Sequence, residues 1–347
     1  MVTDSLKKME QLGWQGIILF DGGLTYKAMH KIQTMLLLLV SLWSLVGCRD
    51  ASPLQPQSGG KPYDVLVVND RSNVVSKALQ FDVMGLPQPE PSFDVSTVDS
   101  AHFEANLRLA RCIVMVNVDS VAFPSPRIRY ERDVWARPQI VVYVGAPSVQ
   151  TLLGGKGQQA RSLRQLLMRF EMNVEIGRLQ HHRNVKAEQL LHKTFGAKLL
   201  IPEEMTSSKV GENFLWLSNN SPTVMCNVVV YKLPSSVTPS ISRFIALRDS
   251  ALGCNIKGEN DNMQMHTAGQ TVVRSSSVLR GRPTTIFRGL WEMEGDDMGG
   301  PFVARVEGNL CVESFVFAPG KSKRNTIRRL EAVLYTLNEP LVNSREK

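Results

Sequence analysis

The chain has 347 residues, of which 43% are hydrophobic and 21% are charged, and its formal net charge is +8. This composition is typical of a globular protein and excludes a largely disordered chain. The positive excess is modest for this length and does not by itself indicate nucleic-acid binding. The cysteines form no Cys-x-x-Cys pair, which argues against zinc ribbons and thioredoxin-type redox sites.

A short apolar run near the N-terminus ends in a cysteine. The run Met35–Val46 is apolar except for Ser41 and Ser44. Its length suits the core of a signal peptide, about 7–15 residues, better than a membrane-spanning helix of about 20 residues. The string Leu45-Val46-Gly47-Cys48 resembles a bacterial lipobox, in which the cysteine is acylated and the preceding residues are removed. We therefore predict lipidation of Cys48 and attachment to a membrane by acyl chains. The alternative is a buried apolar helix with an ordinary cysteine.

The sequence divides into segments of different character. Residues 1–28 carry three acidic residues where a signal peptide should be basic, so we interpret them as a gene-model extension ahead of a start at Met29. Residues 29–47 then form the lipoprotein signal peptide, and residues 48–61 form a linker rich in Pro, Gln, Ser and Gly. The rest is predicted to form an α/β N-terminal half, residues 62–195, and an antiparallel α+β C-terminal half, residues 196–340.

The first half alternates predicted strands and helices. Short valine-rich runs bounded by turn residues predict strands at Tyr63–Val68, Phe93–Val98, Cys112–Val118 and Gln139–Val144. Helices are expected at Ser72–Gln80, Ser100–Leu109 and Ser148–Phe195, the last broken near Gly154–Gly157 and at Gly177. Leu86–Pro91 contains three prolines, which excludes a helix or a central strand there.

The second half has a different order of elements. Strands are predicted at Asn213–Ser218, Val224–Tyr231, Thr284–Met293, Phe302–Val306 and Cys311–Phe317, and helices at Ser240–Leu252 and Asn325–Leu337. This order indicates an antiparallel sheet with helices packed on it and resembles the PsbP-like fold. The likeness is one of fold and carries no function.

Six blocks along the chain resemble one family, the Bacteroidetes lipoproteins catalogued as domain of unknown function 4837. The blocks are Lys61–Val68, Gly85–Pro91, Arg129–Gln139, Asn213–Ser218, Arg288–Trp291 with Met298–Phe302, and Ala318–Asn325. The resemblance implies an envelope lipoprotein of a Gram-negative bacterium, and it implies no activity. The stretch Gly154–Gly157 departs from the family, in which a continuous helix is expected.

The segment Arg129–Gln139 combines charge and aromatic rings in what we predict to be a loop between two strands. Such loops on a rigid sheet often bind ligands. A sugar-like ligand would stack on an aromatic ring and take hydrogen bonds from the polar groups, so the candidate binding residues are Tyr130, Arg132, Asp133, Trp135 and Gln139. The alternative interpretation is an internal salt-bridge cluster that holds the loop in place.

Three other groups of residues have both a functional and a structural interpretation. The acidic cluster at Glu292, Glu294, Asp296 and Asp297 could hold calcium, or it could be an ordinary glycine-rich turn. The basic run from Lys321 to Arg329 could face phosphate head groups or an acidic partner, or it could be a solvated helix face. Cys112, Cys226, Cys254 and Cys311 allow three disulfide pairings, among which the sequence does not choose.

No catalytic motif is found. There is no Gly-x-Ser-x-Gly and no His-Glu-x-x-His, and Gly154-Gly-Lys-Gly157 lacks the P-loop spacing. We therefore predict no catalytic residues, no metal, no cofactor and no nucleic-acid partner. The leading hypothesis is a non-catalytic binding or assembly factor whose partners are the membrane, through acylated Cys48, and an envelope protein or glycan. The alternatives are an envelope hydrolase acting on glycan or peptide, and a purely structural protein. Arg49, rather than Asp, after the cysteine favours the outer membrane.

Overall fold

The computed structural model describes residues 55–154, 157–234, 239–260, 262–279 and 281–338. The predicted signal peptide, Cys48 and the first part of the predicted linker lie outside the described residues. None of the helices in the described ranges is both long enough and apolar enough to cross a bilayer.

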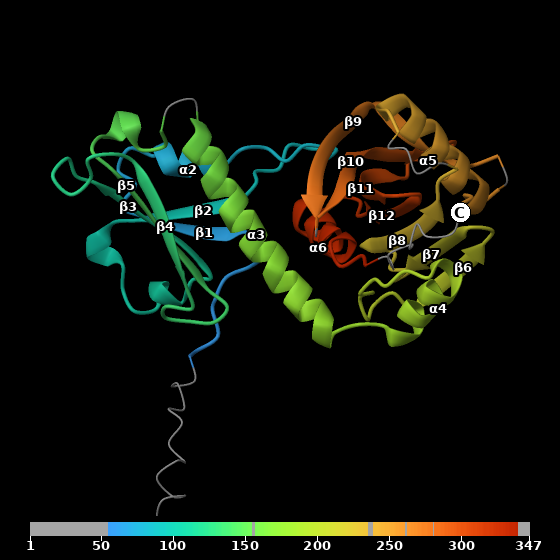
Figure 1. The fold of residues 1–347 in the computed structure, drawn as a ribbon, viewed down its shortest axis with the longest axis horizontal. Helices are drawn as coiled ribbons and strands as arrows, with labels where there is room; N and C mark the ends of the chain where they lie inside the picture. The colour runs from blue at the N-terminus through green and yellow to red at the C-terminus, as the bar shows by residue number, and fades with distance from the viewer. Residues whose placement is uncertain (1–54, 155–156, 235–238, 261, 280, 339–347) are drawn as a thin grey trace, which may run out of the picture. The chain divides into compact units, whose positions relative to one another are not determined.

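The first sheet has five strands in the order β2-β1-β3-β5-β4 (Figure 1). Four of them are parallel, and β4 runs antiparallel to β5 at one edge. The strand bounds are β1 Asp64–Val68, β2 Asp94–Val98, β3 Cys112–Val118, β4 Arg127–Arg132 and β5 Ile140–Ala146. The valine-rich strands β1, β3 and β5 are central in the sheet, and their side chains are buried in a cluster on each face.

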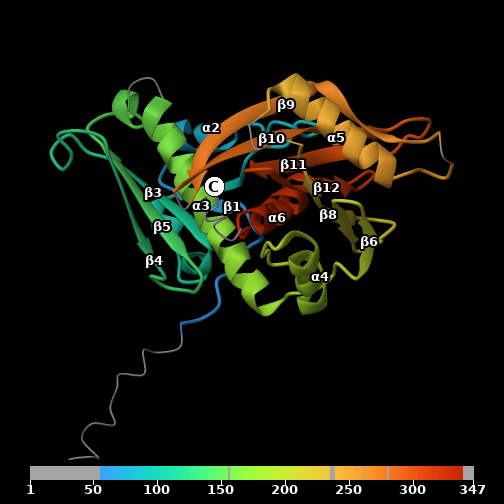
Figure 2. The ribbon, with the colours of Figure 1, turned by 45° about the vertical axis from the view of Figure 1, so that its right-hand side comes forward.

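Two helices, α2 (Val74–Leu79) and α3 (Gln158–His181), cover one face of this sheet (Figure 2). Asp70 fixes the start of α2, because its carboxylate accepts hydrogen bonds from both the amide and the hydroxyl of Ser76, each at 2.8 Å. Among the described residues, short 3-10 helices and loop side chains pack on the opposite face. That face is therefore left partly open.

The second sheet has seven antiparallel strands in the order β6-β7-β8-β12-β11-β10-β9. Their bounds are β6 Ser207–Gly211, β7 Phe214–Ser218, β8 Met225–Lys232, β9 Met265–Leu279, β10 Arg282–Met293, β11 Gly299–Glu307 and β12 Leu310–Phe317. Apolar side chains are buried on both of its faces, in two separate clusters. The fold class is thus the predicted one, an α/β layer followed by an antiparallel sheet with helices.

Helices lie on both faces of the second sheet. α4 (Val185–Phe195) and α6 (Arg324–Leu334) pack on one face, and α5 (Ile241–Asn255) packs on the other. Under α5, Arg248 and Glu313 form an ion pair at 2.8 Å between two side chains that are 0% exposed. The Tyr231 hydroxyl also donates to Glu313, at 3.3 Å, so the buried carboxylate is well supplied with donors.

The basic run at the start of the last helix makes internal contacts through most of its side chains. Glu90, from the proline-rich segment, accepts hydrogen bonds from the backbone amides of Lys323 at 2.7 Å and Arg324 at 3.0 Å. A carboxylate is well placed there, because the first amides of a helix have no partner within the helix. The Arg324 side chain pairs with Asp94, and Arg329 pairs with Glu204. These contacts agree neither with a run that faces phosphate head groups nor with a helix face that is exposed to solvent.

The structure differs from the predicted elements in three places. Strands β4, β6 and β9 were not predicted, because they are edge strands or strands rich in charged and small polar residues. The expected helix Ser100–Leu109 is instead two 3-10 turns, and Asp99 makes no capping hydrogen bond. α3 runs through Gly177 without a break, since a single glycine inside a helix costs only about 0.5–1 kcal/mol.

Two segments pack differently from the division made on the sequence: α4, and the described part of the predicted linker. α4 falls within residues 62–195, yet its buried side chains Ala187 and Leu191 belong to a core cluster of the second sheet. The described part of the predicted linker is attached to the first sheet. The Ser58 amide donates to the carbonyl of Arg137 at 3.1 Å, and the Gly59 amide donates to that of Leu109 at 2.7 Å.

Candidate functional site

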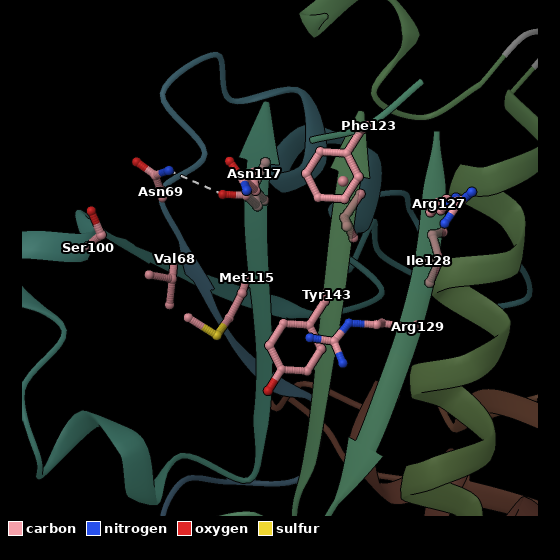
Figure 3. Close-up of a pocket in the computed structure, with 13 residues that line it drawn as sticks. Val68, Asn69, Ser100, Met115, Asn117, Phe123, Arg127, Ile128, Arg129 and Tyr143 are labelled. Atoms are coloured by element: carbon pink, nitrogen blue, oxygen red, sulfur yellow. Dashed lines mark hydrogen bonds between the residues drawn. The ribbon is translucent and has the colours of Figure 1, made fainter. Parts of the chain in front are cut away.

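A groove of about 720 Å³ lies on the open face of the first sheet, near the carboxyl ends of its parallel strands (Figure 3). The strand order reverses there, because β1 has β2 on one side and β3 on the other. Ligands of open α/β sheets bind at such switch points. The groove is lined by Val68, Asn69, Ser100, Met115, Val116, Asn117, Phe123, Arg127, Ile128, Arg129, Tyr143, Val144 and Gly145.

The floor of the groove is apolar and aromatic. Val68, Met115 and Tyr143 come from β1, β3 and β5 and pack in one cluster on the same face of the sheet. The Arg129 guanidinium lies over the Tyr143 ring, 4.1 Å from its centroid, a cation–π contact visible in Figure 3. The Glu131 carboxylate also pairs with this guanidinium, at 2.8 Å. The groove therefore presents a guanidinium plane rather than a bare aromatic face.

A glycine makes room for the aromatic wall of the groove. A Cβ atom at Gly145 would lie 2.3 Å from the Phe123 ring, so only glycine lets this ring approach β5 so closely. The turn that carries Phe123 is fixed by Asp119, which accepts hydrogen bonds from the amides of Val121 and Ala122. These two hydrogen bonds lower the pKa of the Asp119 carboxyl.

Asn69 ties the end of β1 to β3. Its backbone is left-handed, with φ of 65°, a conformation that asparagine tolerates better than most residues. Its side-chain Nδ2 donates to the carbonyl of Val116 at 3.1 Å, which fixes the orientation of the amide (Figure 3). The edge of the groove at this point is therefore held by a side chain whose conformation is fixed.

The groove has no group that would serve as a general base. The residues that line it include no carboxylate, histidine or cysteine. Its one weakly acidic side chain is Tyr143, whose pKa is raised by burial and secondarily by Glu131. The phenol therefore stays protonated at neutral pH. This arrangement can orient and hold a ligand, and it does not supply the proton transfer that most hydrolytic mechanisms need.

The predicted binding residues lie elsewhere, and only three of them come together. The Gln139 Nε2 donates to the carbonyls of Arg108 at 2.6 Å and Ala110 at 2.7 Å, and its Oε1 accepts from the Trp135 amide at 2.9 Å. Asp133 accepts from the Gln139 amide at 2.8 Å. These hydrogen bonds tie the loop to the start of β5 and to the segment before β3, and the ion pair within the group, Arg137 with Asp133 at 3.7 Å, is largely exposed.

Tyr130 and Arg132 are separated from that cluster. They lie on β4, which was predicted to be loop, and their side chains alternate with Arg129 along the strand. They therefore project from the face opposite to the groove. The Asp133–Gln139 cluster precedes β5, whereas the groove lies at the other end of that strand, about 20 Å away at ~3.3 Å per residue.

Sequence reasoning missed the groove residues Asn69, Met115, Asn117 and Tyr143. Two of them carried a usable signal, because Asn69 directly follows one valine-rich strand and Asn117 is the penultimate residue of another, and ligand-binding residues of parallel sheets gather at these ends. Arg129 was within the chosen segment but was not chosen. Its role depends on β4 being a strand, since only then does it face Tyr143.

The acidic cluster lies in the hairpin between β10 and β11, where Gly295 has φ of 77°. Within the described ranges, no group of three or more His, Cys, Asp or Glu side chains is arranged to hold a metal ion. Gly299 and Gly300 are not turn residues, because they begin β11, and a Cβ at Gly300 would lie 2.0 Å from the Val316 carbonyl. The four described cysteines are free thiols.

Two family models match consecutive parts of the chain. Residues 184–336 match the family described as domain of unknown function (DUF4837), and residues 58–180 match the one described as domain of unknown function (DUF8532). No curated protein matches the sequence.

Two solved structures resemble parts of the chain. A crystal structure from Bacteroides thetaiotaomicron is 17% identical, with a TM-score of 0.21, and the match covers 43% of this chain and 47% of that one. The solution structure of cyanobacterial PsbP from Synechocystis is 12% identical, with a TM-score of 0.26, covering 42% of this chain and 87% of that one. The chain thus spans about half the length of the first of these structures.

Proposed function

We propose that this chain, whose residues 184–336 belong to the family described as domain of unknown function DUF4837, is a non-catalytic binding or assembly factor of the cell envelope. It takes its ligand in the groove on the first sheet and is attached to a membrane by acylated Cys48. The observation that carries the proposal is the groove itself, an apolar floor with fixed polar groups around it and no acid–base side chain.

The chemistry of the groove favours a protein segment over a glycan. Sugars usually stack on a free aromatic face, and Arg129 covers the face of Tyr143 at 4.1 Å. The guanidinium is paired with Glu131 at 2.8 Å, and its remaining N–H groups suit backbone carbonyls of a bound segment, while Met115 and Val68 suit an apolar side chain.

Photo-crosslinking in the native envelope tests this assignment. A photoreactive amino acid at Met115 reports on the groove, and the same amino acid at Arg132, on the opposite face of the sheet, is the matched control. We expect one defined protein adduct from Met115 that is absent from Arg132. Identical adducts from both positions, or none from Met115, would contradict a partner in the groove, and a carbohydrate adduct would replace the protein partner with a glycan.

The membrane attachment has a separate test. Cys48→Ala is expected to abolish the incorporation of labelled palmitate, because acyl chains attach to the lipobox cysteine. Unchanged incorporation would disprove the lipobox interpretation and leave the groove assignment standing. Cys254→Ala, which removes an exposed cysteine of the second half, is the control and should keep the label.

An envelope hydrolase acting on glycan or peptide is the alternative, and one observation favours it. His266 lies 3.5 Å from Glu292 beside the acidic hairpin, in a surface hollow of about 640 Å³. Both side chains are largely exposed, and Asp133 does not line this hollow. Hydrolysis of a peptidoglycan digest that is lost in Glu292→Gln would establish the alternative.

A further inference from the structure

A second, smaller cavity of about 230 Å³ lies where the proline-rich segment meets α3, α6 and the strands β10 and β11. It differs from the groove in charge, because three arginines line it: Arg164, Arg288 and Arg328. Its volume is several times the ~30 Å³ that one water molecule occupies in the liquid. A small organic or inorganic ion therefore fits the space.

Arg328 is buried in this cavity without a carboxylate partner. The residue is 5% exposed, and its Nη1 donates to the carbonyl of Ser92 at 2.6 Å. The guanidinium carbon lies 4.5 Å from the centroid of the Tyr63 ring. No carboxylate of the described residues forms an ion pair with it, whereas the buried Arg324 pairs with Asp94. A buried charge is costly unless it is paired, so the cavity carries an unbalanced positive charge.

The other two arginines do not remove this imbalance. Arg288 is balanced by its own ion pair with Glu331. Arg164 donates to the carbonyl of Ala78 at 2.7 Å and lies over the Phe81 ring, so it adds a second cation that has no carboxylate partner in the described chain. The one further acidic side chain at the cavity, Asp82, is exposed at its rim.

We propose that this cavity is a binding site for a small anion that carries a carboxylate or phosphate group, with Arg328 and Arg164 as the residues that bind it. The planar guanidinium donates two parallel N–H bonds to such groups, which a chloride ion cannot accept in the same way. The bound anion would contact segments from both halves of the chain, since Arg164 lies on α3 and Arg328 on α6.

The electrostatics of the cavity agree with this assignment. Burial, together with the nearby cations Arg324 and Arg288, lowers the pKa of Arg328. Among the described residues, Tyr63 and Glu331 raise the pKa of Arg328, but they offset only part of the lowering. A bound anion would restore the balance.

Calorimetric titration of the full chain in detergent, with citrate and with inorganic phosphate at constant ionic strength, tests the site. We expect saturable binding of at least one of the two probes at one site per chain, with sodium chloride giving none. Arg328→Gln is expected to weaken binding about tenfold or more, because a charge-assisted pair of hydrogen bonds is lost. Binding of citrate alone or of phosphate alone would identify which of the two groups the site prefers.

A second variant keeps the test decisive if Arg328→Gln does not fold. Arg164→Gln, at a half-buried position, is expected to weaken binding severalfold, and Arg169→Gln, at an exposed position of the same helix outside the cavity, is the matched control. The proposal is wrong if neither probe binds saturably to the unaltered chain, or if Arg164→Gln and Arg169→Gln bind equally well.

Discussion

The two sheets differ in how completely their faces are covered. The second sheet has helices on both faces, and its buried charges, Arg248 and Glu313, satisfy each other inside the core. The first sheet has helices on one face and a groove on the other. A face covered by helices is closed to ligands, whereas an uncovered face leaves room for one. The difference places the groove, and with it the proposed binding, on the first sheet.

The largest expected effect is in the covered sheet. Arg248→Met leaves the Glu313 carboxylate buried without its cation, and removing one member of a buried pair costs about 3–5 kcal/mol of unfolding free energy. Urea denaturation measures this loss. The double variant Arg248→Met with Glu313→Leu should recover much of it, because no unpaired charge remains. A single variant that loses less than about 1 kcal/mol would show that the pair is not the internal support inferred here.

A glycine substitution probes the open sheet. Gly145→Ala places a methyl group 2.3 Å from the Phe123 ring, so the ring must leave the groove wall. We expect a loss of about 1–3 kcal/mol in unfolding free energy and a reduced yield of the Met115 crosslink. Gly177→Ala is the matched control, since nothing lies within 4 Å of that position in α3. It should stabilise the chain by about 0.5–1 kcal/mol, and equal effects of the two variants would refute the close-approach argument.

The contact between the two halves should give a smaller effect. Glu90→Gln keeps the shape of the side chain and removes the charge that caps α6 through the amides of Lys323 and Arg324. We expect a loss of about 1–2 kcal/mol and faster hydrogen exchange confined to the first turn of α6. Gln88→Glu, in the same proline-rich segment, is a control for a change of charge alone. Exchange that is unchanged in the first turn would contradict the cap.

The smallest effect is a pH dependence shared by both sheets. Burial raises the pKa of the thiols of Cys112 in β3 and Cys311 in β12. An unfolded thiol loses its proton near pH ~8.5, so above that pH the folded chain binds more protons and stability falls as the pH rises. Each thiol contributes at most about 1.4 kcal/mol per pH unit.

Denaturation at neutral pH and at about pH 9.5, in a reducing buffer, measures this slope. The fall of the unfolding free energy with pH should be smaller in Cys112→Ala, which tests the first sheet, and in Cys311→Ala, which tests the second. Cys254→Ala, at an exposed position, is the control. A slope that neither variant changes would mean that other groups, such as the buried Tyr231, whose pKa is also raised, dominate the alkaline loss.

The elements that the sequence predicted are those whose signal is local. Strands β1, β3 and β5 are runs of valine bounded by turn residues, and their identity does not depend on distant contacts. β4 was missed because Arg127–Arg132 carries four charges, which an edge strand tolerates and a central strand does not. The same charges made the segment look like a binding loop.

The residues of the candidate site could not be predicted from the sequence for a related reason. The positions of Asn69, Met115 and Tyr143 in one groove follow from the register of three strands, which no single segment specifies. The basic run at the start of α6 was misinterpreted because Glu90, which accepts the hydrogen bond of the Lys323 amide, lies 233 residues away in the sequence. Charge patterns predict contacts only when the partner is near in sequence.

The cap that Glu90 provides has a consequence for how the chain folds. The first turn of α6 reaches its final hydrogen bonding only when the proline-rich segment of the other half has arrived, and Arg324 and Arg328 are then covered by Asp94 and Ser92. Residues 184–336, produced alone, would expose these two arginines and an uncapped helix end. We therefore expect the two halves to melt in one cooperative transition, so that neither sheet is an independent folding unit.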